Sequence, residues 1–239
     1  MTNNSNKQTA LEKWKTYKKE GRPIAEHIIN IFKAGLSAAP FSGAIASLMS
    51  DYIPHARARR LEEFAEQVAA DLLRLQDRID EDYFRTDDFA FLFEKSFRGV
   101  AEYPQREKLE AFRGILVNAA IVGDLAEEEK EFFLNLAMNL TVLHIRILKF
   151  MAFPEEYLDQ AGIPQVQIQG GFSNFFPIAI PGVELSVIRL AFGDLHRYGL
   201  INTDQSIFGT MTSGQGLDLL RGRVSDLGKR FIHFCTLPQ

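Results

Sequence analysis

Side chains that could act as nucleophiles or bases are few and scattered in this sequence. The chain has one cysteine, Cys235, which would be a nucleophile only beside a base, and the available candidates are His233 and His196. We favour the simpler interpretation, in which Cys235 is a small apolar residue on a closing helix. A single thiol cannot form an internal disulfide, which suits a reducing cytoplasm.

Metal-ligating residue types are present, but their spacing does not indicate a metal site. No two of the five histidines, at positions 27, 55, 144, 196 and 233, have the separation of a metal site. We interpret His144, within an apolar helical stretch, as a hydrogen-bonded core residue. The acidic clusters in 80–88 and 127–131 fit helix ends and first turns, where the helix dipole favours negative charge. Neither cluster has EF-hand spacing.

Phosphate-binding and metalloprotease motifs are also missing from the sequence. There is no GxxxxGK[ST], no GxGxxG after a strand and no HExxH. The most glycine-rich piece, GTMTSGQG at 209–216, lacks the lysine, and we interpret it as the tip of a wing. We therefore expect no cofactor, no metal and no enzymatic activity.

The composition is that of an ordinary folded protein. Of 239 residues, 46% are hydrophobic and 24% are charged, which argues against wholesale disorder. The net charge of −4 argues against a dedicated nucleic-acid-binding protein. The polar, then basic N-terminus has no early apolar run of the kind that a secretory signal requires, so we do not expect export.

A heptad pattern predicts one long helix within 55–84. Apolar residues alternate at steps of four and three, as in a helix that lies along another helix, and three heptads fit a bundle better than a rod. We refer to these residues as the seam, and they are also our candidate oligomer contact: Leu61, Ala65, Val68, Leu72, Leu75 and Ile79.

Helical periodicity continues to about residue 160. Helices are predicted in 86–103, with Thr86 as N-cap, in 104–120, and in 123–153, where Asp124 and Glu127 form a capping-box-like pair. Prolines and glycines in 162–182 exclude a long helix and indicate a linker between two units.

The last part of the chain has the element order of a winged-helix-like module. A helix in 183–199 with Gly199 as C-cap precedes two short β-compatible pieces, LINT at 200–203 and SIFGTMT at 206–212, and a closing helix in 224–235. The predicted fold is mainly α, a multi-helix bundle followed by a small winged-helix-like α+β domain. Its predicted divisions are a polar basic segment at 1–23, a bundle at 24–161, the linker at 162–182 and the winged-helix-like domain at 183–239.

An uncharged stretch, AGLSAAPFSGAIASLM at 34–49, could be a buried hairpin or a membrane-active one. Pro40 breaks a straight spanning helix, and the small residues would let two backbones approach closely in water or in lipid. We favour a buried soluble hairpin. Basic residues on both sides keep the membrane alternative open, and its candidate contacts are Ile28, Phe32, Leu36, Phe41, Ile45 and Leu48.

Charge argues against DNA binding by the C-terminal module. Residues 182–239 carry six Arg and Lys against five Asp and Glu, which falls short of the basic face of a DNA-reading helix. Modules of this kind often serve as protein contacts or dimerisation pieces. We therefore expect a protein partner or a second copy of the chain rather than nucleic acid.

Four stretches follow one another in a familiar order: EKLEAFRGILVNAAI, EEEKEFFLNLAMNLTVLHIRILKFMAFPEEYL, LHRYGLIN and VSDLGKRFIHFC. In this order the chain resembles a group of uncharacterised bacterial helical proteins. Some of these are similar to abortive-infection proteins of the Abi-alpha type. The resemblance covers about residues 85–239 and rests on helix order and apolar spacing. It implies a bacterial protein, cytoplasmic or membrane-associated, with a role in phage defence, and it supplies no catalytic residues.

Three functional hypotheses follow from these patterns. The leading one is a non-enzymatic interaction or regulatory protein, cytoplasmic or peripheral to the inner membrane, that forms oligomers through the seam or the C-terminal module. The second is a membrane-perturbing effector that uses 24–53. The third is a DNA-binding transcriptional regulator that uses the winged-helix-like domain.

Overall fold

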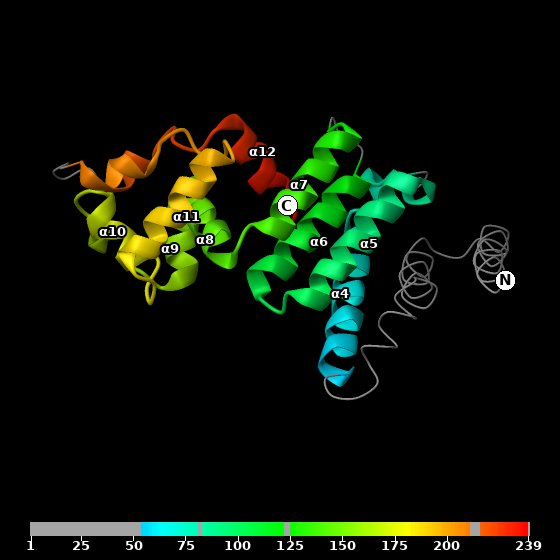
Figure 1. Ribbon diagram of the computed structural model, residues 1–239. Coiled ribbons are helices and arrows are strands. Elements are labelled where there is room, and N and C mark those ends of the chain that lie inside the picture. The colour runs from blue at the N-terminus through cyan, green and yellow to red at the C-terminus, as the bar shows by residue number, and fades with distance from the viewer. Residues whose placement is uncertain (1–53, 81–82, 122–124, 211–215, 239) are drawn as a thin grey trace, which may run out of the picture. The chain divides into compact units, whose positions relative to one another are not determined.

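The computed structural model describes residues 54–80, 83–121, 125–210 and 216–238 (Figure 1). These residues are mainly α-helical, as predicted, and none of them forms a strand. The chain divides into two compact units between Leu134 and Asn135, inside one helix. Unit 1 comprises the described residues up to Leu134 with 237–238, and unit 2 comprises those from Asn135 to Thr236.

Unit 1 is built on three packed helices, α4 (Pro54–Arg74), α5 (Asp87–Glu102) and α6 (Arg106–Ala120). Two 3-10 turns, η1 (Gln76–Arg78) and η2 (Tyr83–Arg85), connect α4 to α5. The N-cap of α5 is Thr86, as predicted, and its side chain accepts a hydrogen bond from the Phe89 amide at 3.1 Å. The next helix, α7 (Glu127–Asn139), carries the boundary between the units.

The seam lies inside unit 1. Leu61, Ala65, Val68, Leu72 and Leu75 are all buried, and α4 packs against α5 and α6. Ile79 lies beyond the end of α4, where it forms an isolated antiparallel bridge with Ile121. The bundle interpretation of the heptads is therefore confirmed. The oligomer interpretation needs correction, because the chain's own helices already cover this face.

A buried ion pair joins α4 and α6 beside the seam. The Arg113 guanidinium donates to the Asp71 carboxylate through Nε, and its Nη1 donates to the Gln67 side-chain oxygen at 3.2 Å. Arg60 of α4 donates to the carbonyl oxygens of Val100 and Ala101, near the end of α5, at 2.9 and 3.1 Å. These contacts fix the register of α4 against its neighbours.

The helix predicted over 123–153 is two helices. α7 ends at Asn139, and α8 (Val142–Ala152) begins after Thr141, whose amide donates to His144 Nδ1 at 3.1 Å. Within the described ranges no single helix has the length and apolar composition to cross a membrane. The pair α7 and α8, bent by 117° at the break between them, has that length and composition only when the two helices are taken together.

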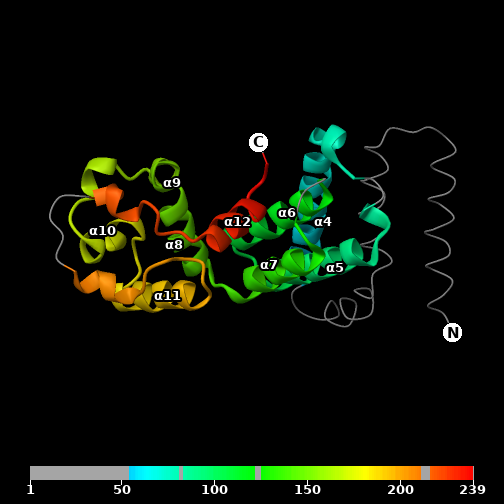
Figure 2. The same cartoon turned by 90° about the horizontal axis from the view of Figure 1, so that it is seen from above.

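Unit 2 is organised around phenylalanine side chains. Its helices are α8, α9 (Pro154–Ala161), α10 (Phe172–Ala179), α11 (Leu185–Arg197) and α12 (Asp226–Phe234), with 3-10 turns η3 (Gln165–Gln167), η4 (Gln205–Gly209) and η5 (Gly216–Leu220). α10 lies against α11 and η4 (Figure 2). The central ring is Phe176, whose centroid lies 5.4, 5.7 and 5.2 Å from those of Phe150, Phe192 and Phe208.

The segment 162–182, expected to be a linker, contributes to this core. Phe172, Phe175 and Phe176 of α10 are almost fully buried. Gly162 and Gly182, at the two ends of the segment, have φ of 67° and 81°, a conformation that glycine adopts without strain. The prolines and glycines predict a linker, but the three phenylalanines within Phe172–Phe176 decide the structure of this segment.

A winged-helix fold is not shown for 183–239. The helices α11 and α12 and the turn at Gly199, with φ of 72°, lie where they were predicted. The predicted strand at Ser206–Gly209 is wrong, because these residues lie in η4. Ile201 and Val224 form one isolated antiparallel bridge. The tip at 211–215 lies outside the described residues.

Close backbone packing joins the ends of α11 and α12. Ser225 Oγ donates to the Gly199 carbonyl at 2.6 Å, and the Ser225 amide donates to the Leu200 carbonyl at 3.1 Å. A Cβ atom at Gly228 would collide with that Leu200 oxygen. Glycine is therefore required at position 228 because the Leu200 backbone lies so close to it, and not because the position has an unusual φ.

The candidate membrane contacts lie outside the described residues: Ile28, Phe32, Leu36, Phe41, Ile45 and Leu48.

Candidate interaction groove

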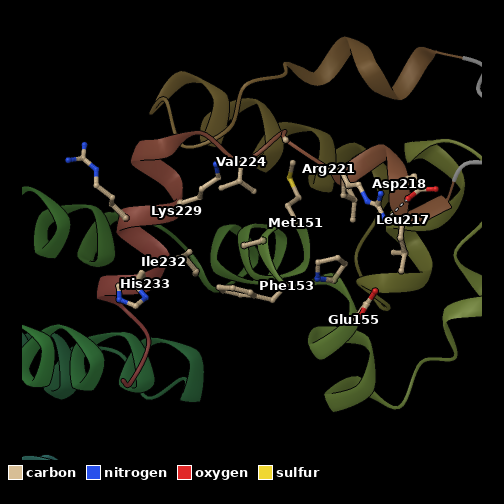
Figure 3. Close-up of a pocket in the computed structure, with 15 residues that line it drawn as sticks. Met151, Phe153, Glu155, Leu217, Asp218, Arg221, Val224, Lys229, Ile232 and His233 are labelled. Atoms are coloured by element: carbon tan, nitrogen blue, oxygen red, sulfur yellow. Dashed lines mark ion pairs between the residues drawn. The ribbon is translucent and has the colours of Figure 1, made fainter. Parts of the chain in front are cut away.

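A cavity of about 680 Å³ lies in unit 2, and we call it the groove. Its walls come from the end of α8 and the start of α9, from η5 and the turn after it, and from α12 (Figure 3). These segments are far apart in the sequence, and the contact of α12 with α8 brings them together.

A forced break between two helices places the central side chain of the groove. Phe153 leaves the helical conformation, with φ of −135° and ψ of 63°, and Pro154 starts α9. Proline cannot continue α8, because it lacks an N–H and clashes with the preceding turn, whereas it suits the first turn of a new helix. The Phe153 ring consequently projects at the corner and remains 43% exposed.

The floor of the groove is apolar and well packed. Met151, Leu220, Val224 and Ile232 line it, and each is at most 5% exposed. Val224 is held by its bridge to Ile201, and Met151 and Ile232 lie on the contacting helices α8 and α12. The floor is thus buried within unit 2, and Phe153 is the most exposed apolar side chain that lines the groove.

Charged side chains surround this floor, and cations outnumber acids. Arg221, Lys229 and Arg230 line the groove together with Glu155 and Asp218, although the whole chain has a net charge of −4. Arg221 pairs with Asp218 at 3.1 Å, the dashed contact in Figure 3, and Lys229 pairs with Asp226 at 3.1 Å. Both pairs are largely exposed, so they contribute little stability and can exchange partners.

The predicted chemical residues do not converge on the groove. Only His233 lines it, whereas Cys235 is buried at the end of α12, as predicted for a small apolar residue. Cys235 is the C-cap of α12, and its amide donates to the carbonyl oxygen of Phe231 at 2.9 Å. Among the described residues, no group of three or more His, Cys, Asp or Glu could hold a metal ion.

His144 is a buried, hydrogen-bonded residue, as predicted, and its partners were not foreseen. Nδ1 lies 2.7 Å from Thr141 Oγ1, and Nε2 lies 3.4 Å from the Asp194 carboxylate on α11. Hydroxyl, imidazole and carboxylate are the groups of a hydrolase triad. Here, however, the Thr141 amide donates to Nδ1, so that nitrogen caps α8 and is not a base for the hydroxyl. The constellation joins α8 to α11.

A second buried cluster, in unit 1, is also structural. Tyr83 donates to Glu127 at 2.7 Å, and Lys130 donates to the same carboxylate at 2.6 Å with its ammonium 4.2 Å from the Tyr83 ring centroid. Burial, followed by the Glu127 hydrogen bond and charge, raises the pKa of the Tyr83 phenol well above its usual range. This neutral phenol holds η2 against α7.

The local signal for the exposed Phe153, though not for the rest of the groove, is AFPEE at 152–156. An apolar run that ends in phenylalanine followed by proline and two acids indicates a helix break that projects an aromatic side chain. Comparison of the chain with known proteins finds no matching family model, no matching curated protein and no matching solved structure.

Proposed function

We propose that this chain is a non-enzymatic interaction protein, and that the groove of unit 2 is where it binds a protein partner. The observation that carries the proposal is Phe153, an aromatic side chain 43% exposed above an otherwise buried apolar floor. Aromatic anchors in packed, desolvated pockets contribute most of the free energy at protein interfaces.

The arrangement of polar groups around Phe153 supports recognition rather than reaction. An apolar centre inside a charged rim is the general anatomy of an interface. Arg221 and Lys229 are each paired with a carboxylate one helical turn away. Such residues can steer and orient a partner, and they do not form a nucleophile–base pair.

The cellular setting follows from the resemblance to abortive-infection proteins. We place the protein in the bacterial cytoplasm or at the inner membrane, with phage defence as its process. The test of this clause is the plating efficiency of a phage panel on host cells that carry the gene, compared with cells that carry its Phe153→Ser form. If both forms of the gene lower the plating efficiency equally, relative to cells without the gene, the protein acts in defence but the groove is not needed for it.

A comparative pull-down tests the interaction itself. Full-length wild-type protein, Phe153→Ser and Val187→Ser are used as baits in lysate of the source organism, with quantitative mass spectrometry. Val187, on α11, is an exposed apolar residue of the same unit and serves as the matched control. We expect at least one protein to be retained by wild type and the control but lost with Phe153→Ser. Identical protein sets from all three baits would contradict the proposal.

A further inference from the structure

We infer that the groove takes an acidic segment of its protein partner, with a large apolar side chain of that segment on Phe153 and carboxylates on both sides of it. This inference rests on the proposed function and specifies the partner's chemistry. Its basis is the distribution of charge around the floor.

The cations stand on both sides of Phe153. Arg221 follows η5 at one side of the groove, and Lys229 lies on α12 at the other (Figure 3). Arg230 also belongs to α12 and lines the groove. All three are exposed. A segment that crosses the floor therefore meets positive charge before and after its apolar anchor, which carboxylates complement and ammonium groups do not.

The resident acids do not remove this preference. Asp218 and Asp226 pair with Arg221 and Lys229 in exposed contacts, with the two carboxylate side chains 66% and 95% accessible. Such pairs are weak in water, and each cation has donors to spare for a second carboxylate. Arg221 can present its guanidinium fork to a carboxylate in two parallel hydrogen bonds.

A peptide segment suits this site better than a small anionic amphiphile. Phe153 is 43% exposed within the groove, and small-molecule sites usually enclose most of their ligand's surface. An amphipathic helix or extended segment needs to bury only one face, and its other face remains in water. The occupant to which the geometry points is therefore a peptide with one apolar face and an acidic border.

The experiment is a selection on full-length protein from a displayed library of random 16-residue peptides, each about 24 Å long when helical. Counter-selection on Phe153→Ser removes peptides that bind elsewhere. We expect the remaining peptides to share a large apolar residue with Asp or Glu on both sides. Remaining peptides with neutral or basic flanks would overturn the inference.

Affinities of the selected peptides, measured by fluorescence anisotropy, supply the quantitative test. Covering the exposed part of a phenylalanine ring contributes about a 10- to 30-fold gain in affinity, so Phe153→Ser should weaken binding by that factor. The double variant Arg221→Glu/Lys229→Glu should weaken it at least tenfold, and the control Arg189→Glu, an exposed arginine of α11, should leave it unchanged. Circular dichroism establishes that each variant is folded.

Two further outcomes separate this inference from the proposed function. If the pull-down yields a Phe153-dependent partner whose binding is unaffected by Arg221→Glu/Lys229→Glu, the acidic segment is wrong and the interaction stands. If no peptide and no lysate protein depends on Phe153, both are wrong. Dodecanoate that binds more tightly than every selected peptide would also overturn the inference, in favour of an amphiphile.

Discussion

Truncation of Leu72 to alanine separates a core residue of unit 1 from a residue of an oligomer interface. Leu72 is fully buried on the face of α4 that packs against α5 and α6. The substitution removes three buried carbon atoms, which at about 0.8 kcal/mol each contribute about 2.4 kcal/mol. The cavity that remains adds to this, so we expect the free energy of unfolding to fall by about 3 to 4 kcal/mol.

The assay is urea unfolding of wild type and Leu72→Ala, followed by far-UV circular dichroism at two protein concentrations, about 1 and 100 µM, because association would make the midpoint depend on concentration. Since Leu72 is covered by its own chain, the loss should be the same at both concentrations. Glu66→Ala, on the exposed side of the same helix, is the control and should change stability by less than about 0.5 kcal/mol. A midpoint that rises with concentration for wild type and not for Leu72→Ala would refute the reasoning.

Three other experiments test the packing within the two units. Gly228→Ala should destabilise the protein by about 3 kcal/mol in thermal unfolding, because the added Cβ meets the Leu200 carbonyl. The control Gly209→Ala has open space for its Cβ and should leave stability unchanged. Equal melting temperatures for the two variants would count against the close contact at Gly228. A double-mutant cycle of His144→Ala and Asp194→Ala should give a coupling free energy of about 1 kcal/mol in denaturant unfolding, and additivity of the two losses would show that α8 and α11 are not joined there. Burial raises the pKa of the Tyr83 phenol above its ordinary value of 10.0, so its contribution to stability is complete below pH 10 and is lost as the pH rises further. Tyr83→Phe should flatten that loss in alkaline unfolding curves, and unchanged curves would contradict the buried phenol.

Patterns that repeat along a helix could be interpreted correctly from sequence, because burial follows from periodicity alone. The heptads of α4 predicted its buried face, and Thr86 and Gly199 predicted the ends of α5 and α11. Each of these signals is local and has one structural solution. The oligomer interpretation of the seam was the part that needed correction. Periodicity shows that this face of α4 is covered, but it does not specify whether the same chain or a second copy covers it.

Features that depend on contacts between distant residues could not be predicted in the same way. The division of 123–153 into two helices depends on the Thr141–His144 cap, which carries no strong consensus. The segment 162–182 was judged by its prolines and glycines, whereas burial of its phenylalanines against α11 and η4 decides its structure.

The groove was beyond sequence reasoning for a related reason. Its floor combines Met151 with Leu220, Val224 and Ile232, which are about 70 to 80 residues away along the chain. Only the Phe153–Pro154 break was visible locally. The side chains with obvious chemistry, Cys235 and His144, proved to be buried residues of the fold.

Site-specific photo-crosslinking tests the central claim most directly. A photoreactive phenylalanine analogue replaces Phe153 in the full-length protein, or Val187 as the control, in cells of the source organism, and crosslinked peptides are identified by mass spectrometry. We predict that position 153, and not position 187, captures one defined segment of a partner protein, with Asp or Glu beside the crosslinked residue. The same products from both positions, or none from position 153, would contradict the groove as the interaction surface.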